Sequence, residues 1–417
     1  MKISPVIRNF CIAILFIFCF WFNLSAQTNN FRIIGYVPNW IDVNTFAQNF
    51  DYKQVTHLNY AFQNPDAAGT LNSSNTGLTT LVSKAHQNNV KVLISIGGGS
   101  AANDPVKTNL LNLIATTEKR AAFITKILAY IKRFELDGLD VDEEGPAINS
   151  NYGAFFKQLS DSLKPKDLLL TAAVGWGGEN IPNSAFQYFD FITLMSYDLT
   201  GTWDLSNPGQ HSPYWYAQKM ISDYKKRGVK KEQICLGVPF YGYGFYKKSG
   251  YLPYSEILSK YPDAGSKDQV GDTIYYNGMN TIWKKTKLAI AECSGVMIWE
   301  LSLDSKNDKS LLKVISTTVD SLKTTGVTGF SNQKSNFKMY PNPAKDEIFI
   351  EVPLNSVKNR IKIYAINGCL VKSLNFNNSN EAKLSIDISG LISGTYICSL
   401  STDNNCFSNN FFIKRTD

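Results

Sequence analysis

The chain has 417 residues, of which 44% are hydrophobic, 13% aromatic and 18% charged. This composition is typical of a globular protein with a sizeable core, and it excludes a disordered or fibrous chain. The formal charge is +7, from 42 Lys and Arg against 35 Asp and Glu. An excess this small, with no basic stripe, argues against nucleic acid as the main partner.

The first 26 residues have the three parts of a secretory signal peptide. Lys2 and Arg8 supply positive charge, an unbroken apolar run covers residues 10–22, and small residues end at Ala26. Such a segment directs export and is then removed. The apolar run is shorter than the ~20 residues that a membrane-spanning helix needs, and no later run approaches that length. We therefore expect a secreted or cell-surface protein without a stable membrane span.

Eight short β-rich segments recur in the next part of the chain. They cover residues 32–38, 55–62, 90–97, 136–144, 168–175, 189–197, 233–241 and 294–300. Between several of them, apolar residues recur at the spacing of an amphipathic helix, as in Leu78, Leu81, Val82 and Ala85. Strands that alternate with such helices form parallel β-α units. Eight of them in ~270 residues predict a closed (β/α)8 TIM barrel, whose reactive residues lie at the C-terminal strand ends.

Three further regions complete the predicted organisation. Residues 242–293 are longer than a plain crossover and predict a small strand–helix insertion between the seventh and eighth strands. Residues 323–336 have the polar composition of a linker. The pattern then changes to alternating strands without helices, which predicts a small all-β sandwich. Its expected strands are residues 347–352, 360–366, 383–389, 394–400 and 409–415. The barrel domain is thus expected over residues 27–322 and the sandwich over residues 337–417.

Five cysteines follow the predicted signal peptide: Cys235, Cys293, Cys369, Cys398 and Cys406. Their spacing is not that of a metal site and the chain has only 3 His, so we expect no metal and no cofactor. Cys235 and Cys293 each precede a glycine of a predicted strand by two residues and could be neighbours. Buried free thiols are favoured over a disulfide between them, and the state of Cys398 and Cys406 is left open.

The most informative segment is residues 137–144, DGLDVDEE. In a strand, Asp140, Asp142 and Glu144 would share one face. Like charges repel in a poorly solvated site, so a structural strand would carry Val or Ile there. A solvated edge strand or a calcium loop is disfavoured by the apolar residues between the acids and by the lack of interleaved oxygen ligands.

The repulsion has a chemical use. With Asp140 and Asp142 beneath it, Glu144 is expected to have a raised pKa and to stay protonated near neutral pH. A protonated carboxyl at a barrel mouth is suited to act as a general acid on a leaving glycosidic oxygen.

This segment and four others resemble the family 18 glycoside hydrolases, the chitinase family. The family's strand-four signature matches at Asp137, Gly138, Asp140, Asp142 and Glu144. The residue before the acid, often aromatic in the family, is Glu143 here, and we expect it on the opposite face. The resemblance continues, in the order of the predicted strands, at residues 95–98, 195–198, 237–242 and 295–299. It covers roughly residues 32–310.

The resemblance implies hydrolysis of β-1,4 bonds next to N-acetylglucosamine with retention, the substrate's own acetamide acting as nucleophile. Glu144 would protonate the leaving oxygen and later activate water. Asp142 would orient the acetamide, Asp140 would tune Asp142, and Tyr197 would hold the acetamide carbonyl. Ser95 is expected to support these groups, because no His follows it in the arrangement of a serine triad. The other expected supporting residues are Asp137, Gly97 and Gly98.

Aromatic residues near the predicted strand ends suit a polysaccharide, because the C–H groups of sugars pack on rings. By resemblance, Trp299 would be the floor of the cleavage position and Trp203 would flank the leaving-group side, with Asp198 contacting sugar. The expected substrate-binding set also includes Trp40, Tyr36, Phe62, Trp176, Tyr241 and Met195. For Tyr36, Phe62 and Trp176, a core or rim position is an equal alternative. Tyr243 stands where many family members have Arg.

The last domain opens with Tyr340-Pro341-Asn342-Pro343 and resembles the type A sorting domain of type IX secretion. This implies export through the outer membrane, followed by release or surface attachment. The alternative is a carbohydrate-binding module. It is disfavoured because the predicted strands show no aromatic row, Tyr364 and Tyr396 being isolated.

Taken together, these patterns predict a secreted, endo-acting, chitinase-like glycosidase. Its partners would be chitin or another N-acetylglucosamine-containing glycan and the secretion machinery. One alternative is an endo-β-N-acetylglucosaminidase acting on N-glycan cores, although such relatives often lack the Tyr197–Asp198 pair. Another is a sugar-binding lectin, although such proteins typically lose the acid, which is present here as Glu144.

Overall fold

The computed structural model forms two compact units, Met1–Thr325 and Gly326–Asp417. The residues that it describes are 31–72, 76–142, 144–145, 148–246, 250–271, 273–326, 338–351, 358–365, 370–377, 383–401 and 406–415. The predicted signal peptide, Glu143 and residues 327–336 of the predicted linker lie outside the described residues.

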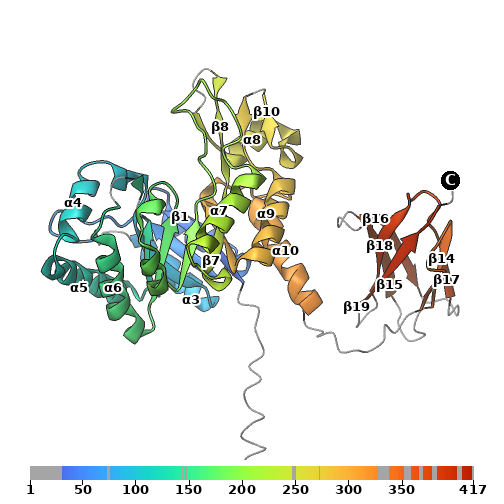
Figure 1. The fold of residues 1–417 in the computed structure, drawn as a ribbon, viewed down its shortest axis with the longest axis horizontal. Helices are drawn as coiled ribbons and strands as arrows, with labels where there is room; N and C mark the ends of the chain where they lie inside the picture. Colours follow the sequence, from blue (N-terminus) through green and yellow to red (C-terminus); the bar gives the residue numbers. More distant parts are fainter. Residues whose placement is uncertain are drawn as a thin grey trace, which may run out of the picture. The chain divides into compact units, whose positions relative to one another are not determined.

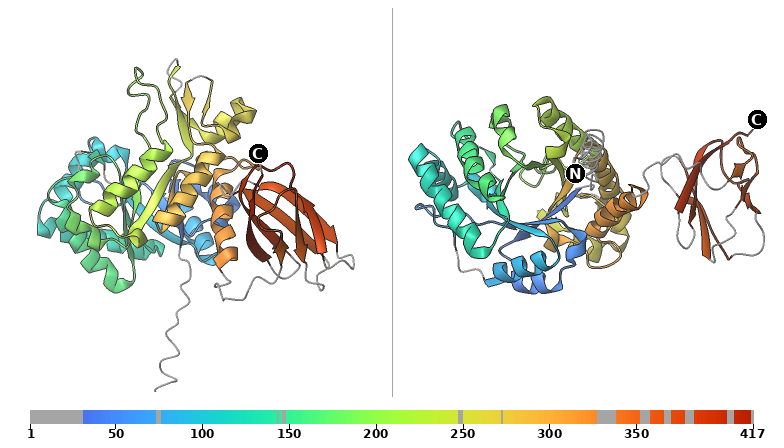
Figure 2. Two further views of the ribbon diagram at one scale, coloured as in Figure 1. Left: turned by 45° about the vertical axis from the view of Figure 1, so that its right-hand side comes forward. Right: turned by 90° about the horizontal axis from the view of Figure 1, so that it is seen from below.

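The first unit is built on a closed barrel of eight parallel strands (Figures 1 and 2). The strands are β1 (Arg32–Pro38), β2 (His57–Ala61), β3 (Lys91–Gly97), β4 (Gly138–Asp142), β5 (Leu169–Val174), β6 (Phe191–Leu194), β7 (Ile234–Pro239) and β12 (Gly295–Trp299). Each strand pairs with its neighbours in the chain, and β12 pairs with β1 to close the ring. The predicted TIM barrel is therefore confirmed, with all eight strands within the expected segments.

Helices surround this barrel, as the view along its axis shows (Figure 2). They are α2 (Val43–Asn49), α3 (Thr76–Gln87), α4 (Val106–Leu113), α5 (Thr117–Phe134), α6 (Tyr152–Leu163), α7 (Tyr214–Lys226), α9 (Met279–Glu292) and α10 (Leu311–Gly326). The regular alternation fails once, between β5 and β6, where two short 3-10 segments, Gly178–Asn180 and Asn183–Tyr188, take the place of a helix. Helix α10 continues to Gly326, so the first four residues of the predicted linker are helical.

Helix α5 illustrates how local sequence sets these elements. The side chain of Thr116 caps the helix by accepting a hydrogen bond from the Lys119 N–H, which satisfies one of the free amides of the first turn. The helix ends at Glu135 in a left-handed conformation with a φ of 55°. Between these ends, Ile124, Ile127 and other apolar residues at helical spacing are buried. The pattern therefore covers the sheet with one stripe of the helix.

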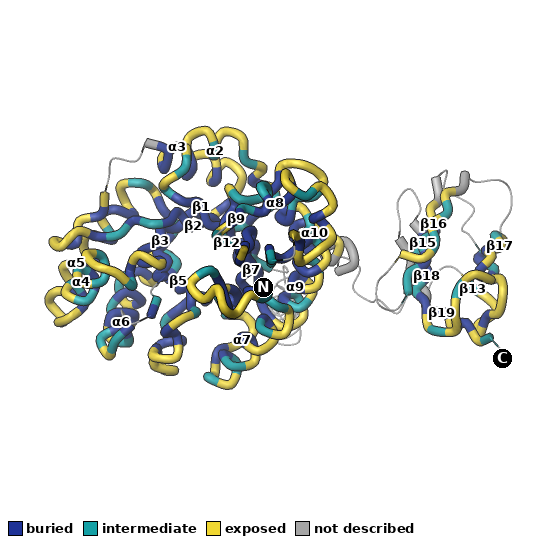
Figure 3. The backbone as a smooth tube through the Cα atoms, turned by 90° about the horizontal axis from the view of Figure 1, so that it is seen from above, coloured by how far each residue is buried: buried dark blue, intermediate teal, exposed yellow. Residues whose placement is uncertain are grey.

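Side chains of the barrel strands alternate between two layers, and the strands are buried along most of their length (Figure 3). On β4, Leu139 and Val141 point outward into the main core shared with the helices. A smaller core, which includes Ile34, Phe191 and Met297, fills the inside of the barrel. The two acids of β4 between the outward residues therefore have to face the inside.

The predicted insertion is present between β7 and β12. It contains a four-stranded antiparallel sheet in the order β10-β11-β8-β9 and a short helix, α8 (Tyr254–Lys260). The strands are β8 (Tyr241–Gly244), β9 (Gly250–Pro253), β10 (Gln269–Val270) and β11 (Ile274–Tyr275). Because β8 starts two residues after the C-terminal end of β7, the insertion rises from the end of the barrel where the site is expected (Figure 1).

The second unit is all β, as predicted, with two antiparallel sheets. One has β13 (Met339–Tyr340), β14 (Glu347–Glu351) and β17 (Lys383–Asp387), and the other has β15 (Lys358–Ala365), β16 (Leu370–Asn377), β18 (Gly394–Ser401) and β19 (Cys406–Ile413). Ile348 from one sheet and Ile361 from the other belong to one buried core. Strands β13 and β16 were not foreseen from the sequence. In β16, Leu370 is exposed, so its apolar pattern is weak.

Cys235 and Cys293 are both buried free thiols. Cys235 belongs to the core inside the barrel, whereas Cys293 belongs to the core between the barrel and the helices. The two side chains therefore pack in different cores, and no disulfide joins them. Cys398 is also a buried free thiol. Among the described residues, no helix combines the length and the apolar character that crossing a membrane requires.

The outward layer of β4 can be tested directly. Leu139 is fully buried, so we expect Leu139→Ala to lower the free energy of unfolding by about 2–5 kcal/mol. Urea unfolding followed by tryptophan fluorescence measures this, because every Trp of the chain precedes residue 300. Leu205→Ala is the matched control, because Leu205 is 45% exposed and its truncation should change stability by less than about 0.5 kcal/mol. Equal effects of the two substitutions would contradict the assignment.

Candidate active site

Asp140 and Asp142 form the base of the site. Both are almost completely buried, at 0% and 3% exposure. Asp140 accepts three hydrogen bonds from hydroxyls on three other strands: Tyr36 on β1 at 2.6 Å, Ser95 on β3 at 2.7 Å and Thr171 on β5 at 2.6 Å. Burial raises the pKa of Asp140, and these hydroxyls oppose that shift. Asp140 is thus held rigidly under Asp142.

Glu144 lies just beyond the end of β4, which stops at Asp142. The next residue, Gly145, donates its N–H to the carbonyl of Trp176 at 2.9 Å. A Cβ on Gly145 would lie 2.6 Å from the Trp176 ring, so the glycine allows the indole to rest against the backbone next to the acid. This contact fixes the segment that carries Glu144.

The pKa of Glu144 is raised from its ordinary value of 4.5 to about 7. Burial is the larger cause, and the negative charge of Asp198 is the second. From the sequence, Asp140 and Asp142 were the expected cause of this shift. The expected direction agrees with this shift, but the neighbouring charge is that of Asp198, because β4 ends at Asp142 and Glu144 no longer continues its alternation.

Tyr197 and Asp198 follow the C-terminal end of β6. Tyr197 is buried, and its hydroxyl lies 3.8 Å from the sulfur of Met297. Burial raises the pKa of Tyr197, and the charges of Asp142, Asp198 and Glu144 raise it further. The phenol therefore lies close enough to Asp142, Asp198 and Glu144 for their charges to act on it.

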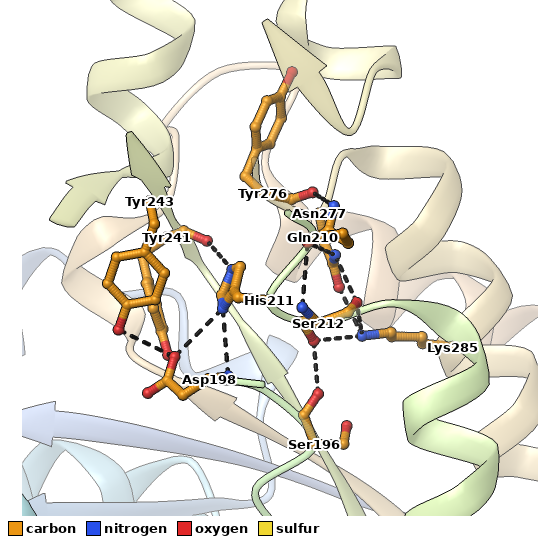
Figure 4. Close-up of polar contacts among 10 residues, drawn as sticks. All are labelled: Ser196, Asp198, Gln210, His211, Ser212, Tyr241, Tyr243, Tyr276, Asn277 and Lys285. Atoms are coloured by element: carbon orange, nitrogen blue, oxygen red, sulfur yellow. Dashed lines mark hydrogen bonds and ion pairs between the residues drawn. The ribbon is translucent and has the colours of Figure 1, made fainter. Parts of the chain in front are cut away.

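Asp198 is partly exposed, and its backbone has a φ of +60°, a conformation that Asp tolerates better than most residues. Its Oδ1 accepts hydrogen bonds from the hydroxyls of Tyr241 at 2.5 Å and Tyr243 at 3.1 Å, and lies 3.3 Å from Nδ1 of His211 (Figure 4). Tyr241 is thus a buried donor to Asp198, and not a sugar-facing ring as expected.

Four aromatic rings, that of Trp299 included, form a cluster at the end of β12. The ring centroid of Trp299 lies 5.6 Å from that of Phe62 in a stacked arrangement, 5.2 Å from Tyr36 and 6.4 Å from Trp40. Trp40 is 63% exposed, whereas Tyr36 is 1% exposed. Tyr36 therefore supports Trp299 and Asp140 from below, and the open face belongs to the other three rings.

Glycines shape this aromatic cluster. Gly98 has a φ of +73°, and a Cβ there would lie 2.3 Å from the ring of Phe62. The preceding residue, Gly97, exchanges two backbone hydrogen bonds with the side chain of Asn64. Gly97 ends β3 and Gly98 follows it directly, so both lie at the C-terminal end of this strand.

The remaining predicted residues separate into two groups. Trp176 and Trp203 are exposed at 65% and 63%, and Met195 is half-buried next to Gly175. Asp137 lies at the opposite end of β4 from Glu144. There it accepts hydrogen bonds from the Val92 N–H at 2.7 Å and contacts His86 at 2.8 Å, so it links β3 and α3 and does not contact the site.

Sequence reasoning missed Thr171, His211 and Tyr251. Thr171 faces Asp140 in strand register, and that pairing follows only from knowing which strands are adjacent. Tyr251, on β9, stacks on Tyr241 with ring centroids 4.5 Å apart. His211 is one of only 3 His in the chain, and its rarity was the one available signal. Among the described residues, no group of three or more His, Cys, Asp or Glu could hold a metal ion.

The arrangement suits acid catalysis on a sugar. It combines a carboxyl that is protonated near neutral pH, a buried carboxylate behind it and an aromatic surface beside it. Sugars present hydroxyl edges and C–H faces, which match these polar and aromatic groups.

This chain is similar to known proteins in both of its units. A family model described as glycosyl hydrolases family 18 matches residues 32–304, and one described as a secretion system C-terminal sorting domain matches residues 338–414. Both resemblances drawn from the sequence are confirmed.

Two solved bacterial structures are among the most similar. The GH18 chitinase ChiB from the chitin utilization locus of Flavobacterium johnsoniae is 35% identical, with a TM-score of 0.66 over 70% of this chain and 95% of that one. A chitinase from Bacteroides thetaiotaomicron is 30% identical, with a TM-score of 0.61 over 69% and 96%. A chitinase-like effector of Moniliophthora roreri is 29% identical over 63% of this chain and 75% of its own length.

The raised pKa of Glu144 predicts a pH-dependent stability. A carboxyl whose pKa rises on folding contributes stability that is complete below its unfolded value of 4.5 and is lost as the pH rises through about 7. We therefore expect Glu144→Gln to be more stable than the native chain at pH 8, by on the order of 3 kcal/mol, and nearly equal at pH 4. Urea unfolding at both pH values measures this difference. A constant difference between the two pH values would contradict it.

Proposed function

Because the chain belongs to glycosyl hydrolase family 18, we propose that it is a secreted, endo-acting enzyme that cleaves β-1,4 bonds of N-acetylglucosamine polymers, such as chitin, with retention. The observation that carries this proposal is the position of Glu144, a carboxyl with a pKa of about 7 at the mouth of the barrel. Asp142 and Tyr197 lie close together, since the charge of Asp142 raises the pKa of Tyr197.

The proposed first step is proton transfer from Glu144 to the leaving glycosidic oxygen. A group with a pKa near the working pH serves as acid in one step and as base in the next. Glu144 can therefore protonate the departing sugar and then take a proton from the incoming water. Its burial supports this cycle, because desolvation makes the charged form costly until the proton is used.

The proposed nucleophile is the acetamide oxygen of the substrate, as the family resemblance implies. Asp142 would accept the acetamide N–H and stabilise the positive oxazolinium-like intermediate. Tyr197 would donate its hydroxyl to the acetamide carbonyl. The high pKa of Tyr197 supports this assignment, because the phenol keeps its proton and remains a donor. The acetamide oxygen would attack the anomeric carbon from the face opposite the leaving group, and water would then attack from the face that the leaving group vacated. Two successive inversions at this carbon give net retention.

The aromatic groups would hold the chain of sugars. Trp299, with Phe62 and Trp40 beside it, offers a surface for the sugar at the cleavage position. Trp176 and Trp203 are exposed rings suited to contacts with neighbouring sugars. Asp198 retains one carboxylate oxygen beyond the Oδ1 that its Tyr and His neighbours contact, which suits a sugar hydroxyl.

The proton of Glu144 is the first point to test. Glu144→Gln should lower kcat on chitooligosaccharides by about 100- to 10,000-fold, and oligosaccharide binding should stay within a few fold, since only the transferable proton is removed. Mass spectrometry of the products and calorimetric titration measure these effects. Glu232→Gln is the control, because Glu232 is exposed and precedes β7, at the other end of the barrel. Undiminished hydrolysis by Glu144→Gln would remove Glu144 from the mechanism.

The same assay distinguishes the substrates. Products from chitooligosaccharides, with an intact glycoprotein left unchanged, are expected. Release of N-glycans from the glycoprotein alone would favour an endo-β-N-acetylglucosaminidase. Binding without any product from the native chain would favour a lectin.

Export is proposed to depend on the sorting domain. Removal of residues 326–417 takes away the second compact unit and leaves every residue of the site in place. We expect the shortened chain to hydrolyse soluble oligomers at the native rate but to stay inside cells that use this secretion system. Immunoblotting of medium and cell fractions measures this. Normal export of the shortened chain would contradict the proposal.

A further inference from the structure

Lys285 is completely buried on α9, outside the site described above. Its ammonium donates hydrogen bonds to the carbonyl of Ser212 at 2.7 Å, to the Ser212 hydroxyl at 2.6 Å and to Oδ1 of Asn277 at 2.8 Å (Figure 4). Lysine is almost never fully buried unless it is paired. Its hydrogen bonds here are to neutral oxygens, so the charge needs an explanation.

The geometry requires the charged form of Lys285. A carbonyl and an amide oxygen can only accept, and the Ser212 hydroxyl already donates its proton to the carbonyl of Ser196 at 2.7 Å. All three partners therefore need an N–H, and only an ammonium supplies three. Burial lowers the pKa of Lys285 to about 7, and Asp268 opposes that shift. The network is thus maintained against the cost of a buried charge.

Ser212 and Ser196 close the base of the loop that carries Tyr197 and Asp198. The Ser212 hydroxyl bonds to one side of the loop, and the Leu199 N–H donates to the carbonyl of His211 at 3.0 Å across it. Ser196 itself donates to the carbonyl of Gly237 on β7. Lys285 is therefore linked through the Ser212 hydroxyl to Ser196, which lies two residues before Asp198.

Residues of the insertion also bind the segment 210–212. The side chain of Gln210 donates to the carbonyl of Tyr276 at 2.6 Å and accepts from the Ser212 N–H at 3.2 Å. Asn277 donates to the carbonyl of Ser212 at 3.0 Å. Residues 210–212 are consequently fixed by both the insertion and α9.

His211 connects this segment to the site. It is completely buried. Its Nε2 lies 3.3 Å from the carbonyl of Tyr241, which can only accept, so Nε2 carries a proton. Its Nδ1 lies 3.3 Å from Asp198 Oδ1 and 3.5 Å from the Asp198 N–H. The imidazole is therefore in contact with Asp198 on one side and with β8 on the other.

We propose that Lys285 is a positioning residue of the active site, which holds residues 210–212 so that His211 and the loop base keep Asp198 beside Glu144. This inference rests on the proposed function for its effect on turnover. Asp198 and Glu144 are like charges when both are ionised, and they separate unless something restrains them. This restraint comes from α9, a helix to which the proposed mechanism assigns no contact with the substrate.

The test compares Lys285→Met with the native chain. Met keeps the length of the side chain and removes the three N–H donors. We expect kcat to fall about 10- to 100-fold, the size of effect that follows from misplacing a catalytic group by about 1 Å, with a smaller change in KM. We also expect Asp198 to move away from Glu144, so that the pKa of Glu144 falls and the alkaline limb of the kcat profile moves to lower pH. Carboxyl NMR titration measures that pKa without turnover.

Two controls separate positioning from folding. Lys284→Met, on the exposed side of the same helix, should leave kcat, KM and the Glu144 titration unchanged. Ser212→Ala removes one partner of Lys285 with a smaller change in volume, and it should shift the Glu144 titration in the same direction. If Lys285→Met does not fold, Ser212→Ala decides the question alone.

The outcomes are distinct. A lower kcat together with a lower Glu144 pKa supports the inference. A lower kcat with an unchanged Glu144 titration, or native values for both, overturns it. If the native chain hydrolyses no glycan, the proposed function fails, while the titration of Glu144 in the variants still decides whether Lys285 positions Asp198.

Discussion

Burying negative charge inside a parallel barrel is the constraint on which this structure depends. Among the described residues, no salt bridge neutralises the buried Asp140. It is instead surrounded by hydroxyls from β1, β3 and β5. Ser95, Asp140 and Thr171 lie at the same level of the sheet, because the register pairs Ser95 with Asp140 and Asp140 with Thr171. A shift of register would leave a buried carboxylate without donors, at a cost of several kcal/mol.

At the mouth of the barrel, Glu144 likewise has no positive charge among the causes that shift its pKa. Burial and the nearby Asp198 both disfavour the ionised form of Glu144. Asp198 in turn receives hydrogen bonds from Tyr241 and Tyr243, which lie on the first strand of the insertion. The insertion is thus part of the electrostatic environment of the acid, and it does more than extend one wall of the site.

Aromatic side chains take two different positions around this charged centre. Trp40, Trp176 and Trp203 are largely exposed, so they are available to a ligand. Tyr36 and Tyr241 are almost completely buried and use their hydroxyls on Asp140 and Asp198. Tyr serves well below the surface, because its ring fills apolar space and its hydroxyl satisfies a carboxylate. The division between the two groups therefore follows how deeply each ring is buried.

Much of this protein could be predicted from the sequence, because the information was local. Alternation along a strand and the i, i+4 spacing on helices do not depend on distant parts of the chain. The eight strands, the inward direction of Asp140 and Asp142 and the cluster of rings at strand ends followed from these periods. The family signature added the expected chemistry of Glu144 and Tyr197.

Only the tertiary structure decided which groups meet. It placed Asp198, and not the strand-four aspartates, as the charge that acts on Glu144. It moved Asp137 to the far end of β4 and brought His211 and Lys285 into a network beneath the loop of Asp198 (Figure 4). These contacts join residues up to 73 positions apart, and they form only when the barrel closes and the insertion folds back. A linear pattern specifies the face on which a side chain lies, but the partner across a closed sheet depends on the path of every intervening loop.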